Sequence, residues 1–213
     1  YVERGRLFTW MAHLVPGEVE MITGIFYAGA GDCYFFPPSG DIWTGLNNVD
    51  FGKAGTATKN AWIPFANVTV PKNATVFSAT FMVRASATGS STTVKIKIGC
   101  EAADNPSDPT TIASAASRVL TTSYTINNNV AAWTAGVEYS FDITSAVQEV
   151  LKRSGWASGN KMAVLIMDNG SSDSASRSFS SYENPTYAEA ILEIVYAIPG
   201  SVESVFLSDY GVM

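Results

Sequence analysis

The sequence has little charge, almost no histidine and no long hydrophobic run. Only 15% of its 213 residues are charged, and 19 acidic residues outnumber 13 lysines and arginines, for a net charge of −6. A nucleic-acid-binding surface needs clustered positive charge, so we predict no nucleic-acid partner. No stretch reaches the roughly 18 apolar residues of a membrane-spanning helix, so we predict no membrane insertion.

The residues that carry most enzyme chemistry are also scarce. His13 is the single histidine, and a Ser-His-Asp or Cys-His arrangement would have to use it. One histidine and two distant cysteines, Cys33 and Cys100, cannot supply the four ligands of a structural zinc site. Two cysteines make no disulfide framework, and we expect two buried thiols. We predict no catalytic residues and that the protein is not an enzyme.

Apolar residues, by contrast, make up 46% of the chain and follow β patterns. In Thr93–Gly99, Ile96 and Lys95 fall on opposite faces of an alternating run, which predicts a half-buried strand. Lys161–Met167 is continuously apolar, which is typical of a strand in a sandwich core. The predicted strands are Ala61–Val70, Thr75–Arg84, Thr93–Gly99, Glu138–Ile143, Lys161–Met167 and Ala188–Tyr196. The pattern predicts an all-β fold, an antiparallel jelly-roll β-sandwich.

One short helix is expected between two of these strands. Ser145 and Gln148 have the spacing of a capping box, and apolar residues follow on one face. Lys152 and Arg153 would lie in the last turn, and Gly155 would end the helix. We expect this helix to plug one end of the sandwich.

The chain divides into three zones. Residues 1–38 form an apolar N-terminal arm, residues 39–197 the jelly-roll sandwich, and residues 198–213 a C-terminal arm. Apolar side chains outside a folded domain need cover, so the arms predict an assembly interface. Its candidate residues are Phe35, Phe36, Val202, Val205, Phe206, Leu207 and Tyr210.

Two kinds of binding site are also candidates. Exposed aromatic rings could stack on sugars, for which we consider Trp43, Trp133, Trp156 and Tyr182, although core packing is the alternative for each tryptophan. Trp62 is assigned to the core. Oxygen-rich loops can bind calcium, and the run from Asp168 to Asp173 is such a loop. The same composition is typical of ordinary turns, so no cofactor is expected beyond a weak calcium candidate.

Two runs carry a family resemblance. Pro71–Thr80 and Phe141–Val147, preceded by Gly40–Trp43, make residues 39–197 similar to the DNRLRE-type domain, a carbohydrate-binding-module-like jelly roll of bacterial, archaeal and phage surface proteins. The resemblance implies a non-catalytic jelly roll with a role in sugar binding or surface assembly.

Two functional hypotheses follow. The first is a non-catalytic structural or adhesive subunit of an extracellular or virion assembly, such as a decoration, tail or surface protein. Its partners would be other copies of itself or other subunits, and its location extracellular or on a virion surface. The second is a free-standing carbohydrate-binding module or lectin-like protein with a cell-surface glycan as its ligand.

Overall fold

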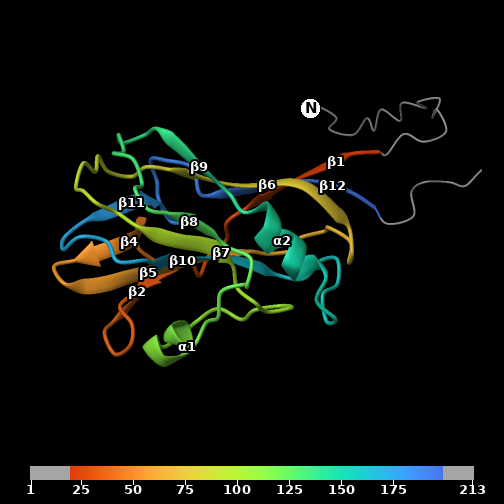
Figure 1. Cartoon of the computed structure of the whole chain (residues 1–213), viewed down its shortest axis with the longest axis horizontal. Coiled ribbons are helices and arrows are strands. Elements are labelled where there is room, and N and C mark those ends of the chain that lie inside the picture. Colours follow the sequence, from red (N-terminus) through yellow and green to blue (C-terminus); the bar gives the residue numbers. More distant parts are fainter. Residues whose placement is uncertain (1–19, 199–213) are drawn as a thin grey trace, which may run out of the picture.

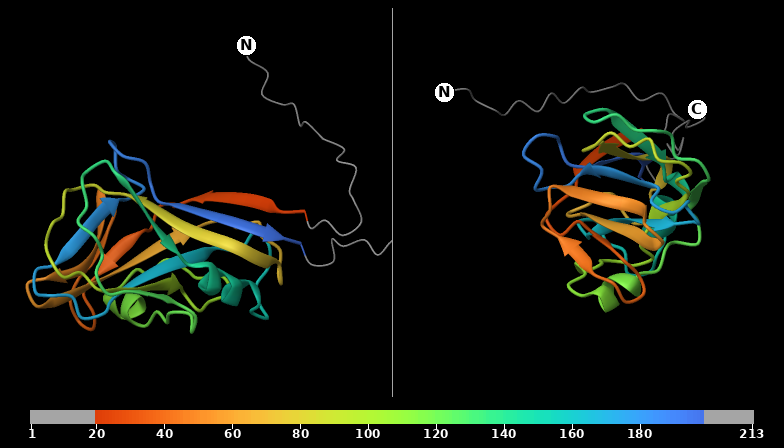
Figure 2. Two further views of the ribbon diagram at one scale, coloured as in Figure 1. Left: turned by 45° about the horizontal axis from the view of Figure 1, so that its top comes forward. Right: turned by 90° about the vertical axis from the view of Figure 1, so that its left-hand side faces the viewer.

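The computed structural model describes residues 20–198, which form a sandwich of two antiparallel sheets, as the alternating apolar pattern predicts. Figure 1 shows the two layers, and Figure 2 shows them from two further sides. The smaller sheet contains, in spatial order, β1 (Ile22–Tyr27), β12 (Ile191–Ala197), β6 (Thr75–Arg84) and β9 (Glu138–Asp142). The larger contains β11 (Ser176–Ser180), β4 (Asn48–Ala54), β5 (Ala57–Phe65), β10 (Met162–Asp168), β7 (Ile96–Cys100) and β8 (Thr125–Asn127), with β2 (Cys33–Phe35) paired to β5 and β3 (Ile42–Thr44) paired to β2.

Alternating residues of the strands build the core between the sheets. In β12, Leu192 and Ile194 are buried, whereas Glu193 and Val195 between and beyond them are half-exposed. Each fully buried aliphatic side chain contributes about 1.5–3 kcal/mol relative to an exposed one. The predicted faces of Thr93–Gly99 are confirmed as well, since Ile96 is fully buried and Lys95 is not.

Aromatic rings hold the centre of the core. The Phe81 ring of β6 lies 6.2 Å from the rings of both Phe65 and Phe179, on two strands of the other sheet. Both pairs meet at nearly right angles, the edge-to-face arrangement that aromatic rings prefer. These contacts fix the stacking of the two sheets.

A second, smaller core lies on the outer face of the larger sheet. Phe35, Trp62 and Leu165 are fully buried there against the short helix α1 (Ile112–Ala116), which Figure 1 shows on the outer side of that sheet. This cover explains why β10 is apolar on both faces. Trp62 belongs to the core, as predicted.

Helix α1 is a difference from the single predicted helix. Thr111 caps it, because its side chain accepts the N–H of Ser114 while the Ser114 hydroxyl accepts the N–H of Thr111. A serine at the third helical position replaces the usual Glu or Gln of a capping box. The helix is also only five residues long, so it carries almost no periodic signal.

The predicted helix is confirmed as α2 (Thr144–Leu151), which packs on β6 and β7 and so bridges both sheets at one end. The predicted capping box is wrong. Ile143 is the N-cap and makes no side-chain cap bond. Gln148 instead accepts the N–H of Val76 and donates to the carbonyl of Ala74, satisfying the start of β6. Lys152 is the C-cap, so the last turn itself contains no basic residue.

Several predicted boundaries need correction. The strands expected from Thr93 and from Ala188 begin later, at Ile96 in β7 and at Ile191 in β12. The strand expected over Ala61–Val70 is β5, which ends at Phe65; Asn67 adopts a φ of 53°, a left-handed conformation that stops an extended strand. The expected N-terminal arm is also too long, since β1 and β2 lie within it and pair with sandwich strands.

Among residues 20–198, no helix combines the length and hydropathy needed to span a bilayer.

Candidate functional site

The outer face of the four-stranded sheet is apolar on one half and polar on the other. Across one row of paired residues, Tyr27 of β1 faces Ile191 of β12, which faces Met82 of β6, which faces Ser140 of β9. Tyr27 is 58% exposed, and its neighbour along the strand, Ile25, is 52% exposed. Nothing among the described residues covers this face, in contrast to the outer face of the larger sheet.

We call Ile25, Tyr27, Met82, Ile191 and Val195 the apolar strip. In the next row of this face Glu193 faces Ile25, and in the row after that Val195 faces Thr23. The polar half of the face carries Glu138, Ser140 and Asp142, all on β9 and all exposed. The apolar side chains therefore gather beside β1, the edge strand, with Glu193 of β12 among them, and further acidic side chains lie on β9 at the opposite edge.

Little of the predicted assembly interface lies on this face. Phe35 is fully buried in the second core, so its assignment to an interface was wrong: alternation in β2 turns it inward beneath α1. Phe36 is half-buried and lies beside Lys59, whose ammonium is 5.9 Å from its ring. Val202, Val205, Phe206, Leu207 and Tyr210 lie outside the described residues. The sequence missed β1 because Gly24 interrupts its apolar alternation.

Two of the four predicted sugar-stacking aromatics are core residues. Trp133 is 2% exposed and stacks on Tyr139 with ring centroids 4.7 Å apart. Trp156 is also 2% exposed, and its indole N–H donates to the carbonyl of Val70 at 3.1 Å. Their places near loops suggested exposure, but each ring fills space between the sheets. Neither can stack on a sugar in this structure.

The other two aromatics reach the surface. Trp43 stacks on Tyr34, with centroids 6.3 Å apart and an angle of 12° between the planes. The Lys59 ammonium lies 5.3 Å above the Tyr34 ring and bonds to Asp50 at 2.7 Å. Burial, together with the nearby Asp50 carboxylate, raises the pKa of Tyr34. Tyr182 is 52% exposed on the loop after β11.

A polar hollow of about 290 Å³ opens beside that loop. Asn184 ties the loop to the carbonyl of Asn47, and Ser178 on β11 bonds to Asp50. The Ser86 hydroxyl is buried there without a hydrogen-bond partner. The lining is uncharged amide and hydroxyl chemistry: Asn47, Asn48, Ser86, Ala87, Ser178 and Asn184. Such a lining suits a small neutral ligand rich in hydroxyl groups.

A larger hollow of about 450 Å³ lies beside α2. Two of its polar side chains are already engaged with the backbone: Glu149 accepts the N–H groups of Thr122 and Ser123, and Gln148 binds the start of β6. Burial alone would raise the pKa of Glu149, but the hydrogen bonds from Thr122 and Ser123 outweigh that effect and lower it. The hollow therefore offers few free groups for a ligand.

Two carboxyl groups meet beneath the Tyr182 loop. Asp32 is buried, and its Oδ2 accepts the N–H of Tyr182 at 2.9 Å. Asp32 Oδ1 and Glu183 Oε2 are both buried without a hydrogen-bond partner. Burial, with the neighbouring Glu183 carboxylate, raises the pKa of Asp32 to about 7. A proton held between the two groups would give both oxygens a partner.

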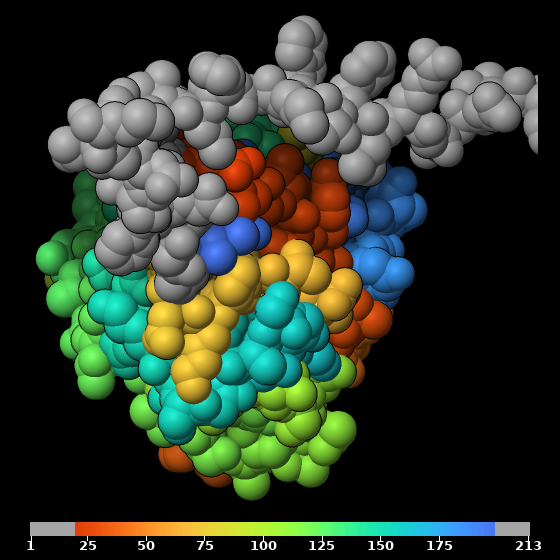
Figure 3. All heavy atoms as spheres, turned by 90° about the vertical axis from the view of Figure 1, so that its right-hand side faces the viewer, coloured from red at the N-terminus to blue at the C-terminus, as the bar shows by residue number. Residues whose placement is uncertain are grey.

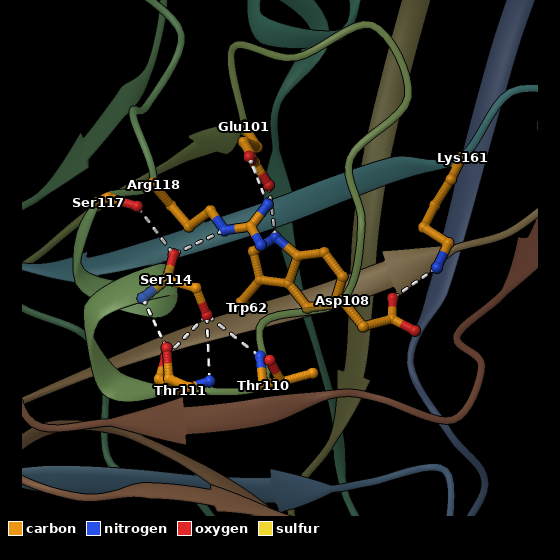
Figure 4. A network of polar contacts seen from close by, with 9 residues as sticks. All are labelled: Trp62, Glu101, Asp108, Thr110, Thr111, Ser114, Ser117, Arg118 and Lys161. Carbon is orange, nitrogen blue, oxygen red and sulfur yellow. Dashed lines mark hydrogen bonds and ion pairs between the residues drawn. The ribbon is translucent and has the colours of Figure 1, made fainter.

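A buried polar network around Glu101 has a structural role. Figure 4 shows the Trp62 indole N–H and the Arg118 guanidinium converging on the Glu101 carboxylate, at 2.6 and 2.9 Å. Arg118 also lies 5.7 Å from the Trp62 ring and donates to the carbonyl of Ser114 in α1. The network thus fastens the 101–120 segment and α1 to the outer face of the larger sheet.

The weak calcium candidates do not converge. Asp168 accepts the N–H groups of Gly170 and Ser171, which makes it the head of an ordinary turn. Asp173 pairs with Lys53 at 3.3 Å and is largely exposed. Within residues 20–198, no group of three or more metal-ligating side chains comes together. The geometry favours the turn interpretation for both residues.

The two cysteines are buried and unpaired, as expected. Burial raises the pKa of Cys33 to about 12, with a contribution from the neighbouring Asp32, and raises the pKa of Cys100 further. Thiolates are the nucleophilic form, so neither residue has the chemistry of an activated cysteine at neutral pH. His13 lies outside the described residues.

Comparison with known proteins does not assign the chain to a family. No family model matches the chain, and no curated protein matches it. The resemblance to the DNRLRE-type domain therefore stays a prediction.

Proposed function

We propose that this chain is a non-catalytic structural subunit that assembles with further copies of itself, on an extracellular or virion surface, through the outer face of its four-stranded sheet. The observation that carries the proposal is the row in which the exposed Tyr27 lies beside the half-buried Ile191 and Met82. Contiguous exposed apolar side chains rimmed by polar ones are typical of protein interfaces. The apolar strip would form the centre of such an interface and the acidic side chains of β9 its rim, with Glu193 of β12 lying beside Ile25 in the centre.

The test is the solution mass of the full chain at increasing concentration, measured by light scattering after gel filtration. We expect the wild type to assemble and Ile191→Lys to reduce the assembly, because an unpaired charge would enter the contact. Ser140→Lys is the matched control, since it adds the same charge in the same row of the polar half. A wild type that stays monomeric at its highest soluble concentration would contradict the proposal.

Glycan binding is the second candidate function, and the polar hollow beside the Tyr182 loop favours it. Ser86 offers a hydroxyl without a hydrogen-bond partner, Asn47 and Asn48 line the hollow beside it, and an exposed aromatic ring lies on the loop that borders them. A glycan array with the full chain is the test. Tyr182→Ala should weaken any bound sugar, whereas Tyr124→Ala, which removes another exposed tyrosine, should not. Equal effects would place the sugar elsewhere.

A further inference from the structure

The edge strand β1 has a free row of backbone hydrogen-bonding groups. Ala28, just past its end, donates its N–H to Ala190 on the β12 side, whereas Gly29 donates to Pro64 on the other side. N–H directions alternate along an extended strand. The N–H and C=O groups of Thr23, Ile25 and Tyr27 therefore point away from β12, and no residue within 20–198 bonds to them.

The other sheet edges carry features that prevent strand addition. β9 has Glu138 and Asp142 at its two ends, and both are exposed. β3 and β8 are three residues long. The outer edge of β11 is bridged to the end of β6, where Ala85 pairs with Phe179. Charge, short length and cover are the usual protections of edge strands.

β1 has none of these protections. It is six residues long and contains no charged residue and no proline. Figure 3 shows its red atoms reaching the molecular surface. An unprotected edge of this kind is a template for another strand.

The sequence of β1 also matches itself in the antiparallel direction. With Ile25 opposite Ile25 of a second copy, Thr23 faces Tyr27 and Gly24 faces Phe26. Residues that face one another then lie on the same face of the joined sheet, and the pairs at 23, 25 and 27 use the free N–H and C=O groups. Gly24 has no side chain to obstruct the second copy, and the Phe26 ring of its own strand lies directly over it.

Electrostatics does not oppose this pairing, although the chain carries a net charge of −6. The acidic residue nearest the edge on this face is Glu193, directly beside Ile25 on β12. In the joined sheet, both copies of β1 separate it from Glu193 of the second copy, by about 14 Å at normal strand spacing. That separation exceeds the screening length of roughly 8 Å at physiological salt.

We infer that two copies of this chain pair through β1, antiparallel about a two-fold axis at Ile25, and so join their four-stranded sheets into one continuous sheet. The inference rests on the proposed assembly function and specifies its first contact. It also places the two apolar strips next to one another, which forms a single wider face. Further subunits would dock on that face.

The test is cross-linking of the full chain through single engineered cysteines. Residues in a hydrogen-bonded antiparallel pair have Cα atoms about 5.5 Å apart, within the range of a disulfide. Ile25→Cys should therefore form a covalent dimer on mild oxidation, seen on a non-reducing gel. Thr23→Cys is the matched control: it would lie about 13 Å from its own copy along the paired strands and should cross-link far less. The native cysteines are both buried and should not interfere.

A second variant tests the backbone contact itself. Ile25→Pro removes an N–H that faces the free edge and leaves the bonds to β12, a position where edge strands tolerate proline. We expect a folded monomer with an unchanged circular dichroism spectrum. If Ile25→Pro fails to fold, Ile25→Lys replaces it, with Val119→Lys as the control at another exposed aliphatic residue.

The outcomes separate this inference from the assembly function. A wild type that assembles while Ile25→Cys and Thr23→Cys cross-link equally, or not at all, would overturn pairing through β1 and leave assembly standing. Assembly of Ile25→Pro at the wild-type mass would do the same. A wild type that is monomeric at every concentration, with no cross-linking of Ile25→Cys, would overturn both.

Discussion

The two sheets of this sandwich differ in how many of their faces are covered. β10, in the middle of the larger sheet, is buried on both faces, by the central core on one side and by the second core under α1 on the other. β1 and β12 of the smaller sheet are covered on one face only, although their outer faces are also rich in apolar residues. The chain therefore covers the outer face of the larger sheet with its own segment, whereas no segment within residues 20–198 does the same for the apolar strip of the smaller sheet.

Among the substitutions considered, a charge buried in the larger sheet should destabilise the protein most. Ile96→Asp places a carboxylate in a fully buried position with no partner, and we expect loss of folding, since a buried unpaired charge costs several kcal/mol. Lys95→Asp, one residue away and only half-buried, should remain folded. Urea unfolding followed by circular dichroism measures both. Equal effects would mean that the faces of this strand are misassigned.

The cover on the larger sheet depends on the Trp62, Glu101 and Arg118 network. Glu101→Ala leaves the Arg118 guanidinium and the Trp62 N–H without their acceptor, and we expect a loss of about 3–5 kcal/mol in the free energy of unfolding. Glu138→Ala removes an exposed pair with Arg84 and should cost no more than about 1 kcal/mol. Similar losses in the two variants would show that the network is not a major support of the cover.

The Asp32 and Glu183 pair should make stability depend on pH. The folded-state pKa of Asp32 is about 7, above its usual value of 3.8, so the folded chain holds a proton that the unfolded chain releases. The stabilisation is fully present below pH 3.8 and is lost as the pH rises through 7, with a total on the order of 4 kcal/mol.

Asp32→Asn keeps a neutral group of the same shape at this position. Its free energy of unfolding should vary much less than that of the wild type between pH 4 and about 8, as measured by urea titrations at several pH values. Asp142→Asn is a useful control, because hydrogen bonds from Thr144 lower the pKa of Asp142, so its contribution to stability is lost only below this window and the variant should keep the wild-type pH dependence within it. A wild-type profile that is flat across this window would exclude a protonated Asp32.

Local patterns in the sequence predicted most of the core strands of the sandwich but little of its surface. β6 matches its predicted bounds, Thr75–Arg84, because alternation and β-branched residues report burial on one face. Trp133 and Trp156 were misplaced because nearness to a loop says nothing about which way a ring points. α1 is too short for periodicity to reveal, and β1 is interrupted by Gly24.

The buried polar groups depend on partners that are distant in the sequence. Arg177 is fully buried, and its guanidinium donates to the carbonyls of Ser91, Val130 and Ala131, which no spacing rule links to it. Asp32 and Glu183 are likewise brought together only by the fold. The outward direction of the β1 backbone also follows from two hydrogen bonds and not from any residue type. Sequence alone could therefore not identify either the carboxyl pair or the free edge.

The smallest change in stability is expected for a substitution on the outer face of the smaller sheet. Tyr27→Ser removes a ring that is more than half exposed, so the free energy of unfolding at low protein concentration should change by only about 0.5 kcal/mol. Leu165→Ser, in the buried strand β10, should lower the free energy of unfolding several times as much.

The two variants should also differ in how their melting temperatures depend on protein concentration. Association stabilises the folded state by mass action, so the wild-type melting temperature should rise with protein concentration. Tyr27→Ser should flatten that rise, whereas Leu165→Ser should lower the whole curve and keep its slope. A Tyr27→Ser curve parallel to that of the wild type would mean that the apolar strip makes no contact in the assembly.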